Sequence, residues 1–137
     1  EKSLAEGATL AIGGRRLGDS GAFYEPTILT GVPEAMTVFR EETFGPVVAL
    51  IRVPNDEEAE RLANLTLYGL GASIWTRSIA HAEKVASRLE AGSIAINKTV
   101  RSDPRLPFGG VKKSGYGREL SHYGIKEFVN IKTVWVK

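Results

Sequence analysis

Apolar positions along the chain recur with two different periods, and the changes of period predict an alternation of strands and helices. Strands are predicted where short apolar or alternating runs lie between turn-forming residues, at residues 8–12, 24–29, 47–53, 72–76, 93–97 and 128–136. Helices are predicted where apolar residues return every three or four positions, at residues 56–66 and 78–89. Shorter helical segments are predicted at residues 2–6 and 118–123, each ended by a glycine.

The segment from residue 47 to residue 97 predicts the centre of the fold. Residues 47–53 form a nearly continuous apolar run, which is typical of a strand covered on both faces, so we expect this strand inside a sheet. The order strand, helix, strand, helix, strand then predicts two right-handed crossovers between three parallel, neighbouring strands. The chain is therefore predicted to be of the α/β class, with a hairpin-like excursion over residues 8–29.

Two later segments do not fit a simple crossover pattern. Residues 98–114 show no period of either kind, and a loop of that length inside a compact domain is more often functional than idle. Apolar and polar side chains alternate over residues 128–136, as in a strand, yet no crossover helix precedes them. If nothing covered it, this strand would be an exposed apolar edge that is prone to pair with another strand. We expect this last strand to pair with something outside the α/β unit.

Composition narrows the classes of protein that the chain can belong to. Its 137 residues are 42% hydrophobic and 25% charged, as in an ordinary globular domain. The formal charge of +2 comes from acidic and basic residues mixed along the whole chain, which is weak evidence for nucleic-acid binding. No apolar run is long enough to span a bilayer and no signal peptide is visible, so we predict no membrane association and a cytoplasmic location.

The sequence contains no convincing pattern for a metal site or a phosphate-binding loop. The chain has no cysteine, and its two histidines, His81 and His122, are too far apart in sequence for a convincing zinc site, so no metal is predicted. The glycine-rich tracts at residues 69–71, 110–114 and 115–117 lack the spacing of a dinucleotide fingerprint or a P-loop. We interpret these glycines as turn and close-approach positions.

Five motifs, taken together and in this order, resemble the C-terminal part of an aldehyde dehydrogenase. They are Glu-Glu-Thr-Phe-Gly-Pro at 41–46, Tyr-Gly-Leu at 68–70, Ala-Gly-Ser-Ile-Ala-Ile-Asn at 91–97, Pro-Phe-Gly-Gly-Val-Lys at 107–112 and Ser-Gly-Tyr-Gly-Arg-Glu at 114–119. The resemblance covers essentially the whole chain. The variant Ser-Asp-Pro-Arg-Leu at 102–106 is most similar to bacterial succinate-semialdehyde dehydrogenases.

The resemblance implies a fold and the domains to which the residues of this chain belong. It implies a parallel-sheet, three-layer catalytic domain, with residues 1–115 as its C-terminal portion and residues 116–137 as a helix and terminal strand that return to an oligomerisation sheet. A dimer or tetramer of identical chains is then expected. A Rossmann domain, which would bind most of the NAD or NADP, is expected upstream, as is the beginning of the helix that ends at Gly7.

The resemblance also implies a reaction. In the family, a cysteine thiolate attacks the aldehyde, hydride passes from the thiohemiacetal to the nicotinamide, and a glutamate activates water to hydrolyse the thioester. The cysteine and that glutamate are expected on residues outside this chain, so the 137 residues alone are expected to be inactive. The implied activity is oxidation of succinate semialdehyde to succinate with NAD(P).

Two residues resemble cofactor contacts of the family. Glu42 resembles the carboxylate that accepts hydrogen bonds from the nicotinamide ribose, and Phe44 resembles the aromatic residue packed beside that ribose. An ionised carboxylate can accept from both ribose hydroxyls, and a ring can fix the sugar without competing for protons. The alternative is that Glu41 and Glu42 form an exposed acidic pair and that Phe44 belongs to the core.

Three residues are candidates for contact with the aldehyde. Phe108 resembles an aromatic residue that lines the aldehyde tunnel, and Ser102 occupies a position that faces the substrate in relatives. We hypothesise that Ser102, with Arg105, holds the distal carboxylate of succinate semialdehyde, because a guanidinium matches a carboxylate and a serine can donate one hydrogen bond. The alternative for Arg105 is a surface residue or a structural ion pair.

For the chain as a whole, the alternative function is a non-catalytic α/β binding or assembly module.

Overall fold

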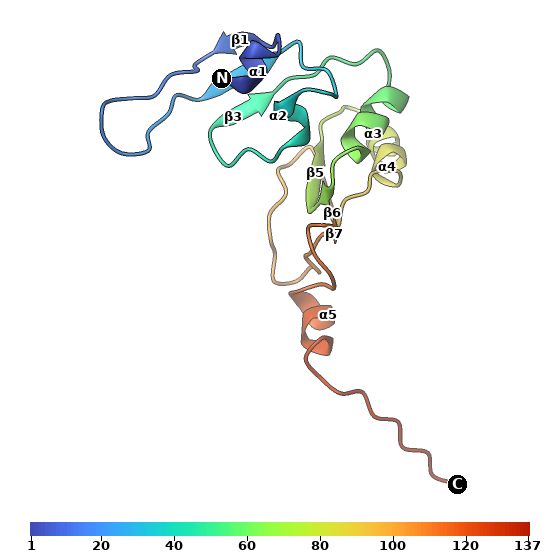
Figure 1. The fold of residues 1–137 in the computed structure, drawn as a ribbon. Helices are drawn as coiled ribbons and strands as arrows, with labels where there is room; N and C mark the ends of the chain where they lie inside the picture. The colour runs from blue at the N-terminus through green and yellow to red at the C-terminus, as the bar shows by residue number, and fades with distance from the viewer. The chain divides into compact units, whose positions relative to one another are not determined.

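The computed structural model describes residues 1–137, which divide into two compact units, residues 1–55 and residues 56–137 (Figure 1). Both units contain helices and strands, so the chain is a mixed α/β structure. None of the helices combines the length and apolar character that a membrane span requires.

The first unit is built on a three-stranded sheet. Strand β1 (Thr9–Ile12) pairs antiparallel with β2 (Thr27–Thr30), and β2 pairs parallel with β3 (Val47–Ala49). Two short helices complete the unit, α1 (Lys2–Ala5) and α2 (Thr37–Arg40). Gly7 follows α1 with a φ of +105°, a conformation that glycine adopts without strain, which confirms the predicted helix end. The antiparallel pairing of β1 and β2 confirms the predicted hairpin-like excursion.

The core of the first unit lies against one face of its sheet. Leu29, Val32 and Met36 are buried there, and Val47 and Ile51 pack against them. Burial alternates along the third strand and beyond, because Val48 and Leu50 point away from the core and are 57% and 63% exposed. The prediction that residues 47–53 form a strand inside a sheet, covered on both faces, is therefore wrong for this chain. Strand β3 is short and lies at the edge of its sheet.

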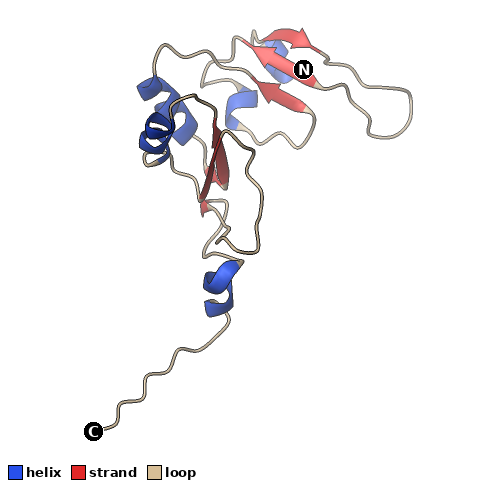
Figure 2. Ribbon diagram, turned by 180° about the vertical axis from the view of Figure 1, so that it is seen from behind, coloured by secondary structure: helices blue, strands red, loops and turns tan.

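The second unit contains three helices and two small sheets (Figure 2). Its elements in order are α3 (Asp56–Asn64), β4 (Tyr68–Gly69), β5 (Gly71–Ile74), α4 (Ile79–Ala86), β6 (Ser93–Ile96), β7 (Val111–Lys112) and α5 (Ser121–Lys126). The hydroxyl of Ser78 accepts a hydrogen bond from the backbone N–H of His81, which confirms the predicted cap of α4.

One of the two predicted crossovers is confirmed. Strands β5 and β6 are parallel neighbours joined through α4, with Gly71 opposite Ser93 and Ile74 opposite Ile96. The prediction of three parallel neighbours is wrong at its first strand, because β3 takes β2 as its parallel partner in the sheet of the first unit. Strand β4 instead pairs antiparallel with β7.

Helix α3 is joined to the segment that follows α4 by polar contacts that the apolar pattern does not indicate. Glu60 is 8% exposed and makes a two-pronged ion pair with Arg88. The side-chain amide of Asn64 donates to the carbonyl of Arg88, and its oxygen accepts from the backbone N–H of Glu90, both at 2.9 Å or less. Ala82 of α4 is fully buried. Glu60 and Asn64 therefore hold residues 88–90 against α3 through a polar network.

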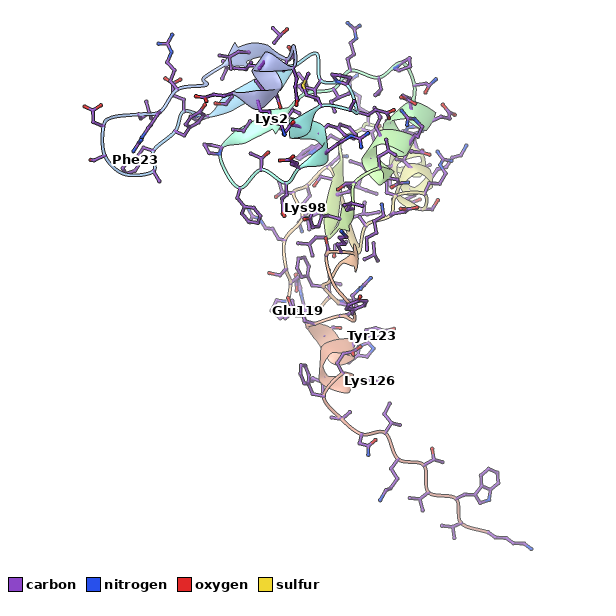
Figure 3. The ribbon with its side chains drawn as sticks, in the orientation of Figure 1. Lys2, Phe23, Lys98, Glu119, Tyr123 and Lys126 are labelled. Atoms are coloured by element: carbon purple, nitrogen blue, oxygen red, sulfur yellow. The ribbon has the colours of Figure 1, made fainter.

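The last helix differs from its prediction. Helix α5 covers residues 121–126, so Gly124 lies inside it and does not end a helix at residue 123. An added Cβ on Gly124 would lie 2.9 Å from the carbonyl carbon of Glu119, and this close approach is why a glycine occurs there. Residues 128–136 pair with no strand of this chain, and their side chains stand exposed along the ribbon (Figure 3).

Candidate functional site

The loop after β6 begins at Asn97, which hydrogen bonds hold in place. Asn97 has a φ of +52°, which asparagine tolerates better than most residues, and its side chain exchanges two hydrogen bonds of 2.8 Å with the backbone of Thr76. Its backbone N–H also donates to the carbonyl of Ile74 at the end of β5. Asn97 is therefore the anchor that joins the loop to the carboxyl end of β5.

The middle of the loop is shaped by one ion pair. The Asp103 carboxylate accepts from the backbone N–H of Arg105 at 3.0 Å and from two nitrogens of its guanidinium at 2.9 and 2.7 Å. These hydrogen bonds hold the pKa of Asp103 well below its ordinary value and raise the pKa of Arg105. Both side chains are therefore charged at neutral pH and largely neutralise each other.

The far end of the loop is fixed by backbone contacts. Phe108 and Glu119 exchange two backbone hydrogen bonds of 2.9 and 2.8 Å. The backbones at Gly92 and Gly109 approach so closely that a Cβ on Gly92 would lie 2.8 Å from the Gly109 carbonyl carbon. A Cβ on Gly69 would likewise lie 2.5 Å from the carbonyl oxygen of Glu90. The contact at Gly69 confirms close approach there, and the positive φ angles of Gly115 and Gly117 fit turn positions.

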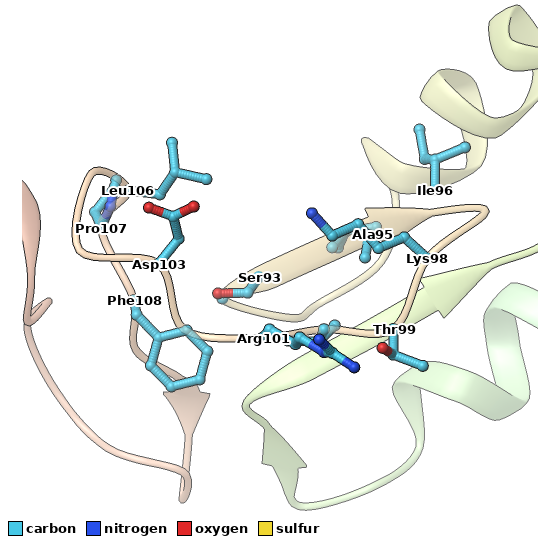
Figure 4. A pocket seen from close by; sticks show the side chains of 13 residues that line it. Ser93, Ala95, Ile96, Lys98, Thr99, Arg101, Asp103, Leu106, Pro107 and Phe108 are labelled. Atoms are coloured by element: carbon cyan, nitrogen blue, oxygen red, sulfur yellow. The ribbon is translucent and has the colours of Figure 1, made fainter.

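Between strand β6 and this loop lies a cavity of about 450 Å³. Figure 4 shows Asp103, Leu106, Pro107 and Phe108 grouped at one end of it, Lys98 and Thr99 at the other, and Ser93 and Arg101 between them. The floor is formed by residues 92–96. The cavity thus combines apolar walls with two cationic side chains and one carboxylate.

The predicted substrate residues lie on this loop but differ in their relation to the cavity. Phe108 lines the cavity. Ser102 is exposed and stands between the lining residues Arg101 and Asp103 without being one of them. Arg105 is 86% exposed at its side chain and is bound to Asp103, which corresponds to the alternative of a structural ion pair. Its guanidinium also retains one nitrogen that Asp103 does not engage.

Sequence reasoning did not single out three lining residues of the cavity, Lys98, Arg101 and Asp103. The one signal that could have pointed to them is position. They lie in the aperiodic loop between Asn97 and the Pro-Phe-Gly-Gly motif, where any side chain close to Phe108 deserves consideration as a contact. Elsewhere in the chain, no group of three or more His, Asp or Glu side chains is placed to hold a metal ion.

The predicted cofactor residues belong to the first unit. They lie on the short segment between Arg40 and Pro46. At its start, the backbone N–H of Arg40 donates to the carbonyl of Met36, at the beginning of α2. At its end, the carbonyl of Pro46 accepts from the backbone N–H of Thr27 at 2.7 Å. Phe44 is 92% exposed on this segment, so the alternative that it belongs to the core is wrong for this structure. Glu41 forms a surface ion pair with Lys2 at 3.6 Å.

The segment fits a sugar ligand in its chemistry. Glu42 is exposed and makes no hydrogen bond or ion pair within the chain, which leaves both carboxylate oxygens available to accept from two hydroxyl groups. The Phe44 ring lies two residues away and offers an apolar face. A carboxylate and a ring on one anchored segment are suited to hold a ribose.

Comparison with known proteins gives consistent matches over almost the whole chain. A model of the aldehyde dehydrogenase family matches residues 1–134. The chain is 51% identical over 135 residues to the succinate semialdehyde dehydrogenase (NAD(P)+) Sad of Escherichia coli strain K12, a match that covers 98% of this chain and 29% of that protein.

Solved structures of succinate-semialdehyde dehydrogenases are also similar to this chain. The succinate-semialdehyde dehydrogenase from Burkholderia pseudomallei is 50% identical with a TM-score of 0.90, over 96% of this chain and 27% of that one. The succinic semialdehyde dehydrogenase from Streptococcus pyogenes, solved with NADP+, is 41% identical with a TM-score of 0.94, over 98% of this chain and 30% of that one. The chain thus spans less than a third of the length of these relatives.

Proposed function

Because the chain belongs to the aldehyde dehydrogenase family, we propose that it is the C-terminal part of an NAD(P)-dependent enzyme that oxidises succinate semialdehyde to succinate. The observation that carries the proposal is the match of residues 1–134 to the family, together with 51% identity to a relative named for this substrate. The larger architecture is part of the same proposal. It comprises a three-layer catalytic domain, to which residues 1–115 contribute, and residues 116–137 as the return to an oligomerisation sheet.

The cofactor role falls to Glu42 and Phe44. When bound, NAD(P)+ supplies the hydride acceptor of the reaction. Glu42 accepts hydrogen bonds from the ribose hydroxyls next to the nicotinamide, and Phe44 packs beside that ribose, so the two residues orient the sugar. The support is their exposure on a segment that is anchored at both ends.

The aldehyde role falls to the loop after β6. Phe108 provides an apolar wall for the carbon chain, and the Ser102 hydroxyl donates to the distal carboxylate. Arg105 contributes through the guanidinium nitrogen that Asp103 leaves unengaged. The nucleophilic cysteine and the base glutamate act from residues outside this chain, which contains no cysteine, so the 137 residues alone are inactive.

The exposed C-terminal segment supports the assembly part of the proposal. Phe128, Ile131 and Trp135 are 89%, 78% and 91% exposed on residues that pair with no strand of this chain. A segment with that much exposed apolar surface is expected to be covered, and we propose that it joins the sheet of a second copy in a dimer or tetramer. Removal of residues 128–137 from the full-length protein should then yield smaller species in analytical ultracentrifugation.

The test of the proposed function is a spectrophotometric assay of the full-length protein that contains these residues. We expect formation of NADH or NADPH with succinate semialdehyde, and none with the 137-residue chain alone. Absence of any aldehyde-dependent reduction of either cofactor would favour the alternative, a non-catalytic binding or assembly module. Cell fractionation with the same protein tests the proposed cytoplasmic location.

A further inference from the structure

The side chain of Lys112, in β7, joins three segments that are far apart in sequence. Its ammonium group donates to the carbonyls of Asn64 and Thr66, at 2.6 and 3.1 Å, and pairs with the Glu90 carboxylate at 2.6 Å. Asn64 is the last residue of α3, where unpaired carbonyls and the negative end of the helix dipole favour a cation. Glu90 belongs to the segment after α4. Lys112 therefore ties β7 to the end of α3 and to that segment.

The backbone of Lys112 has a conformation that lysine rarely adopts. Its φ is +55°, in the left-handed region that favours glycine. A residue persists there only where its contacts outweigh the strain, and residues of this kind cluster at functional sites. Glycine would relieve the strain at position 112 but could make none of the three contacts of the ammonium group. The contacts of the side chain are therefore the reason for a lysine at this position.

Strand β7 lies close in sequence to a wall of the cavity. Phe108, which lines the cavity, is only four residues before Lys112. Gly109 and Gly110 stand between Phe108 and β7, and they have no side chains that could pack and hold the segment. The strand itself has two residues, paired with residues 68–69 of β4, which is a short ladder. The place of the Phe108 ring thus depends on what else holds β7.

We propose that Lys112 is a positioning residue for the aldehyde site, which holds Phe108 in the wall of the cavity by tying β7 to the end of α3. The proposal rests on the proposed aldehyde dehydrogenase function and on the role of Phe108 in it. Lys112 does not line the cavity, so it acts through Phe108 and not by contact with the aldehyde. Its side chain is 23% exposed, which leaves the ammonium group largely enclosed by the segments that it joins.

The test measures the KM for succinate semialdehyde, the KM for NAD(P) and the thermal midpoint of the full-length protein. Lys112→Met keeps the length of the side chain but removes every donor, whereas Lys112→Arg keeps the charge and the donors. Lys113→Met is the matched control, because it removes a neighbouring, exposed lysine. Glu60→Gln is the control for stability, because the ion pair of Glu60 with Arg88 also holds the segment after α4 against α3 without involving β7.

We expect Lys112→Met to raise the KM for succinate semialdehyde about tenfold and to leave the KM for NAD(P) unchanged, because a small displacement of a substrate contact weakens binding. Lys112→Arg should restore most of the affinity, and Lys113→Met should change nothing. Glu60→Gln should lower the thermal midpoint with both KM values unchanged.

A double-mutant cycle with Phe108→Ala tests the route of the effect. If Lys112 acts through the Phe108 ring, Lys112→Met should raise the KM for the aldehyde much less in the Phe108→Ala protein than in the wild type. Should Lys112→Met yield no folded protein, Glu90→Gln takes its place, since it weakens one of the three contacts, and we expect a smaller rise in the same KM.

Three results would overturn the proposal. The first is a lower thermal midpoint in Lys112→Met, or in Glu90→Gln where that variant replaces it, with an unchanged KM for the aldehyde, which would leave Lys112 a stabilising residue only. The second is an undiminished effect of Lys112→Met in the Phe108→Ala protein, which would exclude action through the ring. Both leave the proposed function standing. The third is absence of aldehyde oxidation by the unmodified full-length protein, which removes the proposed function as well.

Discussion

Substitution of Gly92 by alanine is the sharpest perturbation that the structure offers. The added Cβ would lie 2.8 Å from the carbonyl carbon of Gly109, closer still to its oxygen, and 3.0 Å from the Cα of Gly110. All three atoms belong to the backbone, so no side chain can rotate out of the way. Gly92 does not have a positive φ, and the cost of the substitution is therefore steric and not conformational.

The magnitude follows from the size of the overlap. To reach ordinary contact distance, the two backbones must separate by on the order of 1 Å, and overpacking of this kind costs about 1–3 kcal/mol. The displaced backbone carries Phe108, which is bonded to Glu119 on its other side. Because a displacement of about 1 Å at a substrate contact can reduce a rate about 100-fold, we expect kcat/KM for aldehydes to fall to about that extent.

The assay measures kcat/KM for butanal and the thermal midpoint of the full-length protein. Gly31→Ala serves as the control, since Gly31 has a φ of +64° and its nearest neighbour would lie at 3.7 Å, so its cost is conformational and far from the loop in sequence. We expect Gly31→Ala to lower the thermal midpoint with kcat/KM nearly unchanged. Wild-type kinetics and a wild-type midpoint in Gly92→Ala would refute the reasoning, because the strand and the loop would then not be in rigid contact.

Three further predictions concern single side chains. Glu42→Gln should raise the KM for NAD(P) with little change in the KM for aldehyde, as measured by initial rates at varied cofactor concentration. Arg88 donates to Glu60 and lowers the pKa of Glu60 below 4.5, so the pair stabilises the fold above that pH. The difference in thermal midpoint between wild type and Glu60→Gln should vanish as the pH falls through the lowered pKa. Lys112 donates to two carbonyls at the end of α3 and pairs with Glu90 at 2.6 Å, so Lys112→Met should destabilise the protein by about 1–2 kcal/mol in urea unfolding.

The elements that could be predicted from sequence are those whose signals are local. The cap at Ser78, the apolar stripe of α4 and the glycine before β6 each act within a few residues, and together they fixed the crossover from β5 to β6. The aperiodic loop before Pro-Phe-Gly-Gly lines the cavity, and its functional role stays a prediction.

The errors arose where one pattern has two physical causes. A continuous apolar run predicts a strand covered on both faces, but in residues 47–53 only the alternate side chains Val47, Ala49 and Ile51 pack against the core. Gly124 was taken for a helix end because glycine commonly occupies that position, whereas here it permits close approach to Glu119. Neither distinction is visible without the neighbouring segments.

The polar part of the site was the hardest to predict. Glu60 is an acidic residue on an amphipathic helix, and nothing in its neighbours in sequence indicates that Arg88 would bury it. Arg105 was a candidate carboxylate binder because guanidinium groups fit carboxylates, yet Asp103, two residues away, uses the same chemistry. Partners of charged groups depend on the path of the loop, and hydrophobic patterns do not determine that path.

The most direct test of the central claim is a crystal structure of the full-length protein with NADP+ and succinate, the proposed product. The account predicts Glu42 within hydrogen-bond distance of the nicotinamide ribose and Phe44 beside it. It also predicts the distal carboxylate of succinate on Ser102 and Arg105, with Phe108 along the carbon chain. Succinate bound away from the loop between β6 and β7, or a ribose held by other residues, would contradict it.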